Sequence, residues 1–151
     1  MNRATVAHGR TGVCTRQLRT PQRILVVDDT EAVREFISLI LTEAGYECQA
    51  VRSGCEALGL LEAGERFDLM LCDLLNNPYG ITLLERTKKS YPKMPVIIAT
   101  APCCVCTARF AVNGMGASDY LLKPFRAQAL LTTVWQTLAG RSISGSAFGT
   151  A

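Results

Sequence analysis

The sequence predicts an α/β protein built on a doubly wound, five-stranded parallel sheet with helices on both faces. Short apolar segments rich in β-branched residues recur along the chain, and each is followed by a segment whose apolar residues have helical spacing. The expected strands are apolar on both sides, which is typical of a parallel sheet covered by helices on both faces. A chain of 151 residues is also of a size that forms one hydrophobic core.

The first strand and helix set the pattern for the other elements. Residues 23–27 form a β-branched run, residues 31–44 place apolar side chains three and four positions apart, and Gly45 ends the helix. Ser53 and Glu56 form a possible capping box at the start of a second helix. The remaining strands are expected at 47–51, 68–72, 96–100 and 119–122, and the remaining helices at 81–90, 107–112 and 125–138.

Composition divides the chain into three parts. Residues 1–21 lack periodicity and predict a flexible arm, residues 22–140 hold the folded domain, and the Gly- and Ser-rich residues 141–151 predict a flexible tail or the start of a linker. Five of the 16 Lys and Arg residues precede the first acidic residue, which leaves 11 basic against 13 acidic residues in the remaining chain. The arm's arginines are sparse, so we expect disorder there rather than binding to nucleic acid.

The sequence also has no apolar run near the roughly 20 residues that span a bilayer, and no signal-peptide core. We therefore expect a cytoplasmic protein that binds no membrane.

Polar residues follow the expected strands at the end where ligands bind in open parallel sheets. Asp28 and Asp29 end the first strand, Asp73 follows the third, Thr100 ends the fourth, and Lys123 follows the fifth. Adjacent carboxylates repel one another unless they are paired or bind a metal, and donor sets made of oxygen suit a hard cation such as Mg²⁺. The sequence therefore predicts a magnesium site in which Asp73 can act as a nucleophile beside a lysine and a hydroxyl.

Four segments in this order resemble response-regulator receiver domains of the CheY-like superfamily, whose fold is flavodoxin-like. They are the segment Ile24–Asp29 with sequence ILVVDD, the strand-end Asp73, the pair Thr100 and Ala101, and the segment Asp119–Phe125 with sequence DYLLKPF. The resemblance covers residues 22–140.

The resemblance implies a signalling domain rather than an enzyme that acts on other substrates. A histidine kinase or a histidine phosphotransfer protein would donate a phosphoryl group to Asp73, with Mg²⁺ held by Asp29, Asp73 and the Leu75 carbonyl, and by Asp28 largely through water. Lys123 would contact the phosphoryl group. Thr100 would move to hydrogen-bond that group as Tyr120 swings inward. The output would be a downstream protein target or a fused domain, with homodimerisation possible.

Two segments depart from the family pattern. Family members usually carry Met-Pro in the loop after the phosphorylated aspartate and a glycine eight positions on, whereas here Pro78 comes one place late and Gly80 one place early. The second departure is the stretch 102–106, with sequence PCCVC, where receiver domains have polar, helix-favouring residues.

The seven cysteines lack the spacing of a disulfide framework, so we expect reduced thiols. Cys103, Cys104 and Cys106 have no second cysteine pair or nearby histidine to complete a tetrahedral site, which makes a metal or redox role the less favoured alternative. Cys72 should face away from Asp73 by strand alternation and serve in packing.

Other functions fit the sequence less well. A haloacid-dehalogenase-like phosphatase needs an aspartate two positions after Asp28, where this chain has Thr30, and no glycine-rich phosphate loop follows the first strand. The main alternative is a receiver-like protein-interaction module that no longer switches by phosphorylation. The sequence does not identify the kinase, the signal, the output or the oligomeric state.

Overall fold

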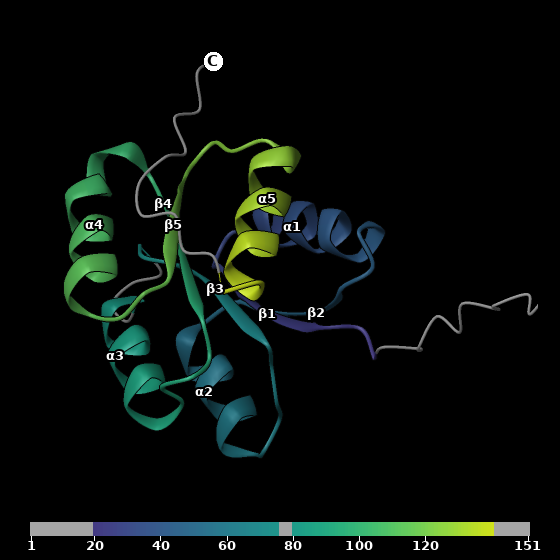
Figure 1. The fold of residues 1–151 in the computed structure, drawn as a ribbon, viewed down its shortest axis with the longest axis horizontal. Helices are drawn as coiled ribbons and strands as arrows, with labels where there is room; N and C mark the ends of the chain where they lie inside the picture. Colours follow the sequence, from purple (N-terminus) through teal and green to yellow (C-terminus); the bar gives the residue numbers. More distant parts are fainter. Residues whose placement is uncertain (1–19, 76–79, 141–151) are drawn as a thin grey trace, which may run out of the picture.

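The computed structural model describes residues 20–75 and 80–140, and these residues form a three-layer α/β domain (Figure 1). The expected arm and tail fall almost entirely outside the described residues, apart from residues 20 and 21. In the described part of the chain five strands form one sheet: β1 Arg23–Val27, β2 Glu47–Val51, β3 Leu69–Asp73, β4 Val96–Thr100 and β5 Asp119–Leu122. The helices are α1 Glu31–Glu43, α2 Gly54–Glu62, α3 Gly80–Ser90, a 3₁₀ turn η1 at Pro102–Cys104, α4 Val105–Gly114 and α5 Ala127–Leu138.

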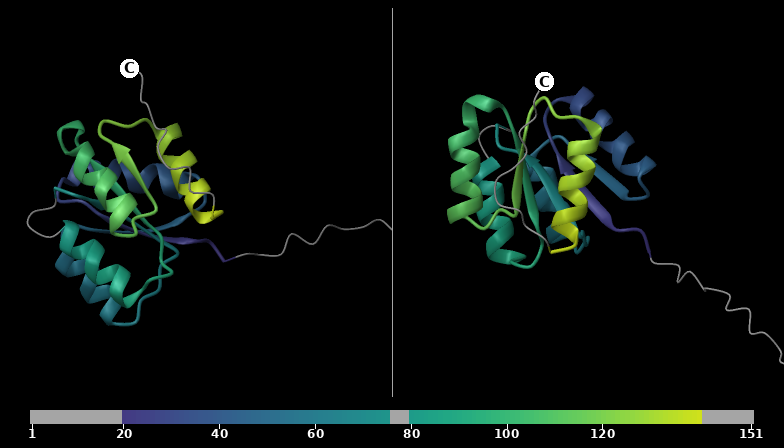
Figure 2. Two further views of the ribbon diagram at one scale, coloured as in Figure 1. Left: turned by 60° about the vertical axis from the view of Figure 1, so that its left-hand side comes forward. Right: turned by 45° about the horizontal axis from the view of Figure 1, so that its top comes forward.

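The sheet is fully parallel and has the strand order β2-β1-β3-β4-β5. This order confirms the predicted doubly wound fold, because the chain moves outward from β1 in both directions. Figure 2 shows α1 and α5 together on one side of the sheet and α2, α3 and α4 on the other. No helix in the described ranges is long and apolar enough to cross a membrane.

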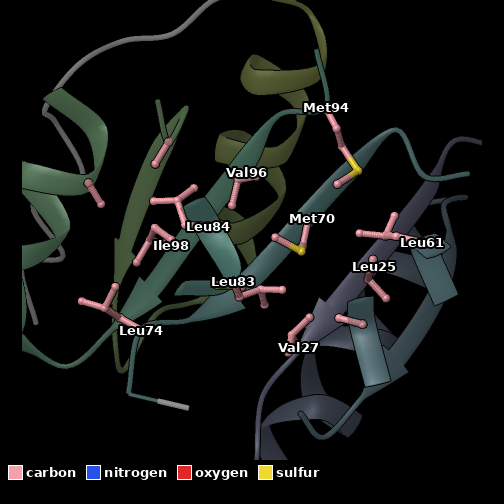
Figure 3. Packing of buried hydrophobic residues seen from close by; sticks show 14 of the residues in the cluster. Leu25, Val27, Leu61, Met70, Leu74, Leu83, Leu84, Met94, Val96 and Ile98 are labelled. Atoms are coloured by element: carbon pink, nitrogen blue, oxygen red, sulfur yellow. The ribbon is translucent and has the colours of Figure 1, made fainter. Parts of the chain in front are cut away.

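Strand alternation divides the core into two layers. Ile24 and Val26 of β1 pack toward α1 and α5, whereas Leu25 and Val27 pack toward α2 and α3. Figure 3 shows the second of these layers, in which Met70 and Ile98 from the sheet meet Leu84 of α3. Burial on both faces explains why β1, β3 and β4 are almost continuously apolar, as parallel sheets require.

The register of the sheet brings the ends of the strands together. Val27, the last residue of β1, pairs with Cys72, so Asp28 and Asp73 both come one residue after this pair. Cys72 is completely buried in the layer beneath α2, α3 and α4, which confirms that it faces away from the site and packs in the core.

Several expected boundaries were wrong by one or two residues. The third strand begins at Leu69 because Asp68 is exposed and its carboxylate accepts a hydrogen bond from the Arg23 backbone N–H at 2.7 Å. The last helix begins at Ala127, since the Phe125 ring instead contacts Phe36 of α1, with ring centroids 6.3 Å apart. The first helix ends at Glu43, one residue before the expected end.

The remaining differences lie at the starts of helices. The third helix begins at Gly80, one residue before the expected start, and α4 spans Val105–Gly114, which is longer than the expected helix. The expected capping box is half formed: the Ser53 hydroxyl accepts a hydrogen bond from the Glu56 backbone N–H at 3.2 Å, but the Glu56 carboxylate binds Arg52 instead of reaching back to Ser53.

Candidate functional site

The carboxyl ends of four strands place the predicted site residues at one edge of the sheet. Asp28 follows β1, Asp73 is the last residue of β3, Thr100 is the last residue of β4, and Lys123 follows β5. Asp28 and Asp73 are only 1% and 7% exposed, and Thr100 is completely buried. Carboxylates this buried need partners, because an unpaired buried charge is strongly destabilising.

Lys123 is the cationic partner of both buried carboxylates. Its Nζ atom lies 2.6 Å from Oδ2 of Asp28 and 3.1 Å from Oδ2 of Asp73. Burial by itself would lower the pKa of Lys123, but the hydrogen bonds and charges of the two aspartates outweigh burial and raise this pKa above its ordinary value. The lysine is therefore held in its charged form between the two strand ends.

Asp29 completes an acidic group with Asp28 and Asp73. One carboxylate oxygen from each residue lies within 4.8 Å of the others, although the Asp29 side chain is exposed. The three carboxylates outnumber the two cations beside them, the ammonium group of Lys123 and the guanidinium of Arg34, so negative charge exceeds positive charge at this edge. An oxygen-only donor set with excess negative charge fits a hard divalent cation such as Mg²⁺.

Backbone and side-chain hydrogen bonds fix the acidic residues. Oδ1 of Asp28 accepts a hydrogen bond from the Thr30 N–H at 2.9 Å, and Oδ1 of Asp73 accepts one from the Leu75 N–H, also at 2.9 Å. The Arg34 guanidinium donates to the Asp28 carbonyl at 2.8 Å. Sequence reasoning missed Arg34, although a basic residue in the first turn of a helix that follows an acidic loop is a detectable signal.

The side-chain hydroxyl of Thr100 has no hydrogen bond in this arrangement. Its Oγ1 atom is buried without a partner of ordinary geometry. A buried hydroxyl without a partner costs free energy in this state, and an acceptor supplied in another state of the protein would remove that cost. The hydroxyl is therefore available to an added acceptor at the carboxyl end of β4.

Tyr120 occupies the middle of β5, beside Ile98 of β4, and is half-buried against the core beneath α4. Its phenolic group also interacts with the exposed Arg109 of α4 and thereby raises the pKa of the Arg109 guanidinium. Tyr120 thus lies between the sheet and α4, three residues before Lys123 in the sequence.

The α3 helix approaches the end of β3 very closely at Gly80. A Cβ atom at this position would meet the carbonyl oxygen of Leu74 and would lie 2.8 Å from the carbonyl oxygen of Asp73. Glycine is therefore required where the shortened loop returns to the sheet. Loop residues 76–79 lie outside the described residues, and with them Pro78, which is one place later than the proline of other family members.

The Leu75 carbonyl stays a predicted metal ligand. Leu75 is the last described residue before the loop, its side chain is 49% exposed, and its N–H is directed to Asp73.

Comparisons with known proteins identify the family of the chain. A model of the "Response regulator receiver domain" family matches residues 24–135. The chain is 40% identical over 121 residues to a response regulator protein, FleR, from Pseudomonas aeruginosa, covering 79% of this chain and 25% of that protein. It is 37% identical over 112 residues to a response regulator, MprA, from a Mycobacterium species, covering 74% and 48% respectively. The chain thus spans between a quarter and a half of these relatives.

Solved structures give the same result. A CheY-like response regulator receiver domain protein from Methanospirillum hungatei superposes with a TM-score of 0.74 at 31% identity, covering 83% of this chain and 100% of that one. A response regulator from Chloroflexus aurantiacus gives a TM-score of 0.72 at 36% identity, covering 80% and 99% respectively. With the strand order, the acidic edge and the family match in agreement, the chain belongs to the receiver domains of two-component response regulators.

Proposed function

We propose that this receiver domain accepts a phosphoryl group on Asp73 in the presence of Mg²⁺ and signals through a change in conformation. The observation that carries the proposal is the contact of the Lys123 ammonium group with both Asp28 and Asp73 beside a third carboxylate, Asp29. This arrangement supplies a nucleophile, a fixed cation and an unbalanced negative charge at one point.

The reaction transfers the phosphoryl group from nitrogen to oxygen. A carboxylate oxygen of Asp73 attacks phosphorus in the phosphohistidine of a partner, the P–N bond breaks, and the imidazole leaves and takes up a proton. Oδ1 of Asp73 is held by the Leu75 N–H, whereas Oδ2 contacts Lys123, so the carboxylate keeps a fixed orientation. Lys123 can pair with a phosphoryl oxygen after transfer. It lies close to Asp73, and its ion pair with Asp28 can hold it in place when its contact with Asp73 changes.

Asp28, Asp29 and Asp73 would hold the magnesium ion, together with the Leu75 carbonyl. Bound Mg²⁺ supplies neutralising charge for the phosphoryl oxygens. The residues of this chain then align the acceptor and exclude water, because Asp28, Asp73 and Thr100 are buried.

The unpartnered Thr100 hydroxyl supports the proposed switch. A phosphoryl oxygen on Asp73 would give this hydroxyl an acceptor, and movement of Thr100 would leave room for Tyr120 to turn inward. The switch would then change the surface formed by α4 and β5, where Tyr120 meets Arg109.

The proposed partners are a histidine kinase or a histidine phosphotransfer protein in the cytoplasm, and a downstream protein or fused domain that reads the switch. We propose no catalysis beyond phosphorylation and dephosphorylation of the domain itself, and no direct contact with nucleic acid or membrane. Homodimerisation through one of its faces is compatible with this function.

The proposal is tested by binding of beryllofluoride, a phosphoryl mimic, followed by ¹⁹F NMR with Mg²⁺ present. We expect a bound signal for the wild-type protein and none for Asp73→Asn. The control is Asp68→Asn, which removes a carboxylate at the opposite end of the same strand and should leave the signal unchanged. A folded wild-type protein that gives no bound signal would support the interaction module that no longer switches.

A further inference from the structure

Two adjacent thiols stand at the start of α4, outside the acidic site. The Sγ atoms of Cys103 and Cys104 lie 3.5 Å apart. Cys103 is exposed and Cys104 is partly buried. Both belong to the 3₁₀ turn that connects β4 to α4, so they lie three and four residues after Thr100.

The geometry of this pair does not suit a disulfide. The Cα atoms of adjacent residues are about 3.8 Å apart across a trans peptide, whereas ordinary disulfides have Cα separations of about 4.4 Å or more. A bond between Cys103 and Cys104 would therefore be strained and easily reduced. A metal ion bound by both sulfurs does not require the larger Cα separation of a disulfide.

The separation of the sulfurs does suit a metal ion. Two thiolates on one tetrahedral Zn²⁺ ion, each with a Zn–S bond of about 2.3 Å, stand about 3.8 Å apart. The observed 3.5 Å is close to this value, so the two sulfurs need little movement to share an ion. Thiolates select soft metals, whereas the carboxylates at the strand ends select hard cations, so one chain can hold both classes without competition.

The surroundings of Cys104 link the pair to the acidic site. The neighbouring Cys103 thiol is the main cause that raises the pKa of Cys104, while the Thr100 hydroxyl acts in the opposite direction and the charge of Asp73 adds to the rise. Cys104 therefore lies near Thr100, whose buried hydroxyl has no hydrogen-bond partner. The backbone N–H of Cys104 also donates to the carbonyl of Ala101, the residue after Thr100, at 3.0 Å.

We propose that Cys103 and Cys104 form a two-thiolate site for a soft divalent cation of the Zn²⁺ or Cd²⁺ class. Each thiol gives up its proton as the metal–sulfur bond forms, so binding of one ion releases two protons. Cys106 is exposed on the first turn of α4, but it forms no group of three metal-ligating residues with this pair among the described residues. Water or another small ligand completes the coordination.

The site has a further consequence that rests on the proposed phosphorylation of Asp73. An ion held by Cys103 and Cys104 fixes the turn at Pro102–Cys104 and with it the position of Thr100. The movement of Thr100 toward a phosphoryl group then becomes less favourable. We expect bound metal to weaken the binding of beryllofluoride, since a ligand that favours one state shifts the equilibrium away from the other.

The test is titration of the reduced protein with Cd²⁺ in excess Mg²⁺, followed by the ultraviolet absorption of the thiolate–Cd²⁺ bond, which carboxylates do not produce. We expect one ion per chain. Cys103→Ser and Cys104→Ser should each weaken binding at least about tenfold, because loss of groups that merely support metal ligands already costs about that much. Binding should strengthen with rising pH as the two thiols lose their protons.

Cys55→Ser is the matched control, since Cys55 is an exposed thiol on α2 and no cysteine adjoins it in the sequence. It should leave Cd²⁺ binding unchanged. Equal binding by Cys103→Ser and the wild-type protein would overturn the proposal, as would an equal loss in Cys55→Ser. Circular dichroism checks the fold of each variant, and the exposed position of Cys103 makes its replacement by serine mild.

The consequence for switching has its own readout. Beryllofluoride affinity should fall when Cd²⁺ is added to the wild-type protein and should not change in Cys103→Ser. An unchanged affinity in the wild-type protein would contradict the link to Thr100. If no beryllofluoride binds at all, the proposed phosphorylation fails, whereas the Cd²⁺ titration still decides the thiolate site.

Discussion

Thr100 and Thr87 carry the two buried side-chain hydroxyls that lack a hydrogen-bond partner in the part of the chain that the structure describes. Thr100 ends β4 at the acidic site, whereas Thr87 lies in α3. An unsatisfied buried hydroxyl costs about 1–3 kcal/mol. The cost at Thr100 is understandable if the hydroxyl gains an acceptor on phosphorylation, but nothing in the structure explains the cost at Thr87.

Replacement of each threonine by valine separates stability from switching. Valine has a similar shape and no hydroxyl, so Thr100→Val and Thr87→Val should each raise the free energy of unfolding by about 1 kcal/mol, measured by urea denaturation. Only Thr100→Val should abolish the NMR shift changes that beryllofluoride causes in α4. Retention of these changes in Thr100→Val would remove Thr100 from the switch.

Gly80 offers a second test at the scale of one residue. Gly80→Ala forces a methyl group against the carbonyl oxygens of Asp73 and Leu74, and we expect the free energy of unfolding to fall by about 1–3 kcal/mol, as for other overpacked positions. Gly59→Ala is the control, because nothing lies within 4 Å of a Cβ there and alanine favours the interior of α2 by up to about 1 kcal/mol. Thermal unfolding of both variants checks the prediction.

At the scale of the element, α1 and α2 differ in how they begin. Ser53 caps α2 through its hydroxyl, whereas Thr30 begins α1 without a side-chain cap, and its hydroxyl donates to Asp29 instead. Ser53→Ala should therefore lower the free energy of unfolding by about 1 kcal/mol, and Ser53→Asn should restore most of it. Thr30→Ala should cost clearly less in the same urea titration. An equal loss at both positions would contradict the assignment of the caps.

The elements also show how far the sequence could be interpreted. The strands were predictable because a parallel sheet buries both faces, and β1, β2, β4 and β5 have the predicted bounds. The start of α4 was not predictable, because a 3₁₀ turn precedes the helix and because Pro102 and three cysteines do not show helical spacing of apolar residues. Boundaries at Asp68 and Phe125 depend on contacts with Arg23 and Phe36, which are distant in sequence.

The site was predictable for a different reason. In a parallel sheet the carboxyl ends of the strands share one edge, so Asp28, Asp73 and Lys123 could be brought together from their positions alone. The role of Arg34 and the close approach at Gly80 could not be predicted from the sequence, because both depend on how α1 and α3 lie against the sheet. The 3.5 Å between the sulfurs of Cys103 and Cys104 likewise depends on the side-chain geometry of the turn.

At the scale of the whole molecule, Lys123 makes the free energy of unfolding depend on pH and on magnesium. Its pKa is raised in the folded state, so its contribution to stability is fully present below the ordinary pKa of 10.5 and is lost as the pH rises through the higher folded-state pKa. The wild-type protein should therefore lose more stability above pH 10.5 than Lys123→Met does. Urea denaturation across this pH range gives the comparison.

The same variant should respond more strongly to magnesium. Without Lys123 the carboxylates of Asp28 and Asp73 lose their cationic partner, so Lys123→Met should be less stable than the wild-type protein at neutral pH. Mg²⁺ at about 100 times its dissociation constant stabilises a folded protein by about 2.7 kcal/mol. We expect the gain in thermal stability on adding Mg²⁺ to be larger in the variant, and an equal gain would indicate that the ion does not bind at these carboxylates.

The central claim is that Asp73 is the phosphoryl acceptor. The most direct measurement is the intact mass of the protein after incubation with acetyl phosphate and Mg²⁺, for the wild-type chain and for Asp73→Asn. The account predicts the addition of one phosphoryl group to the wild-type protein and none to the variant. A folded wild-type protein without the added mass, or an Asp73→Asn variant that gains it equally, would contradict the account.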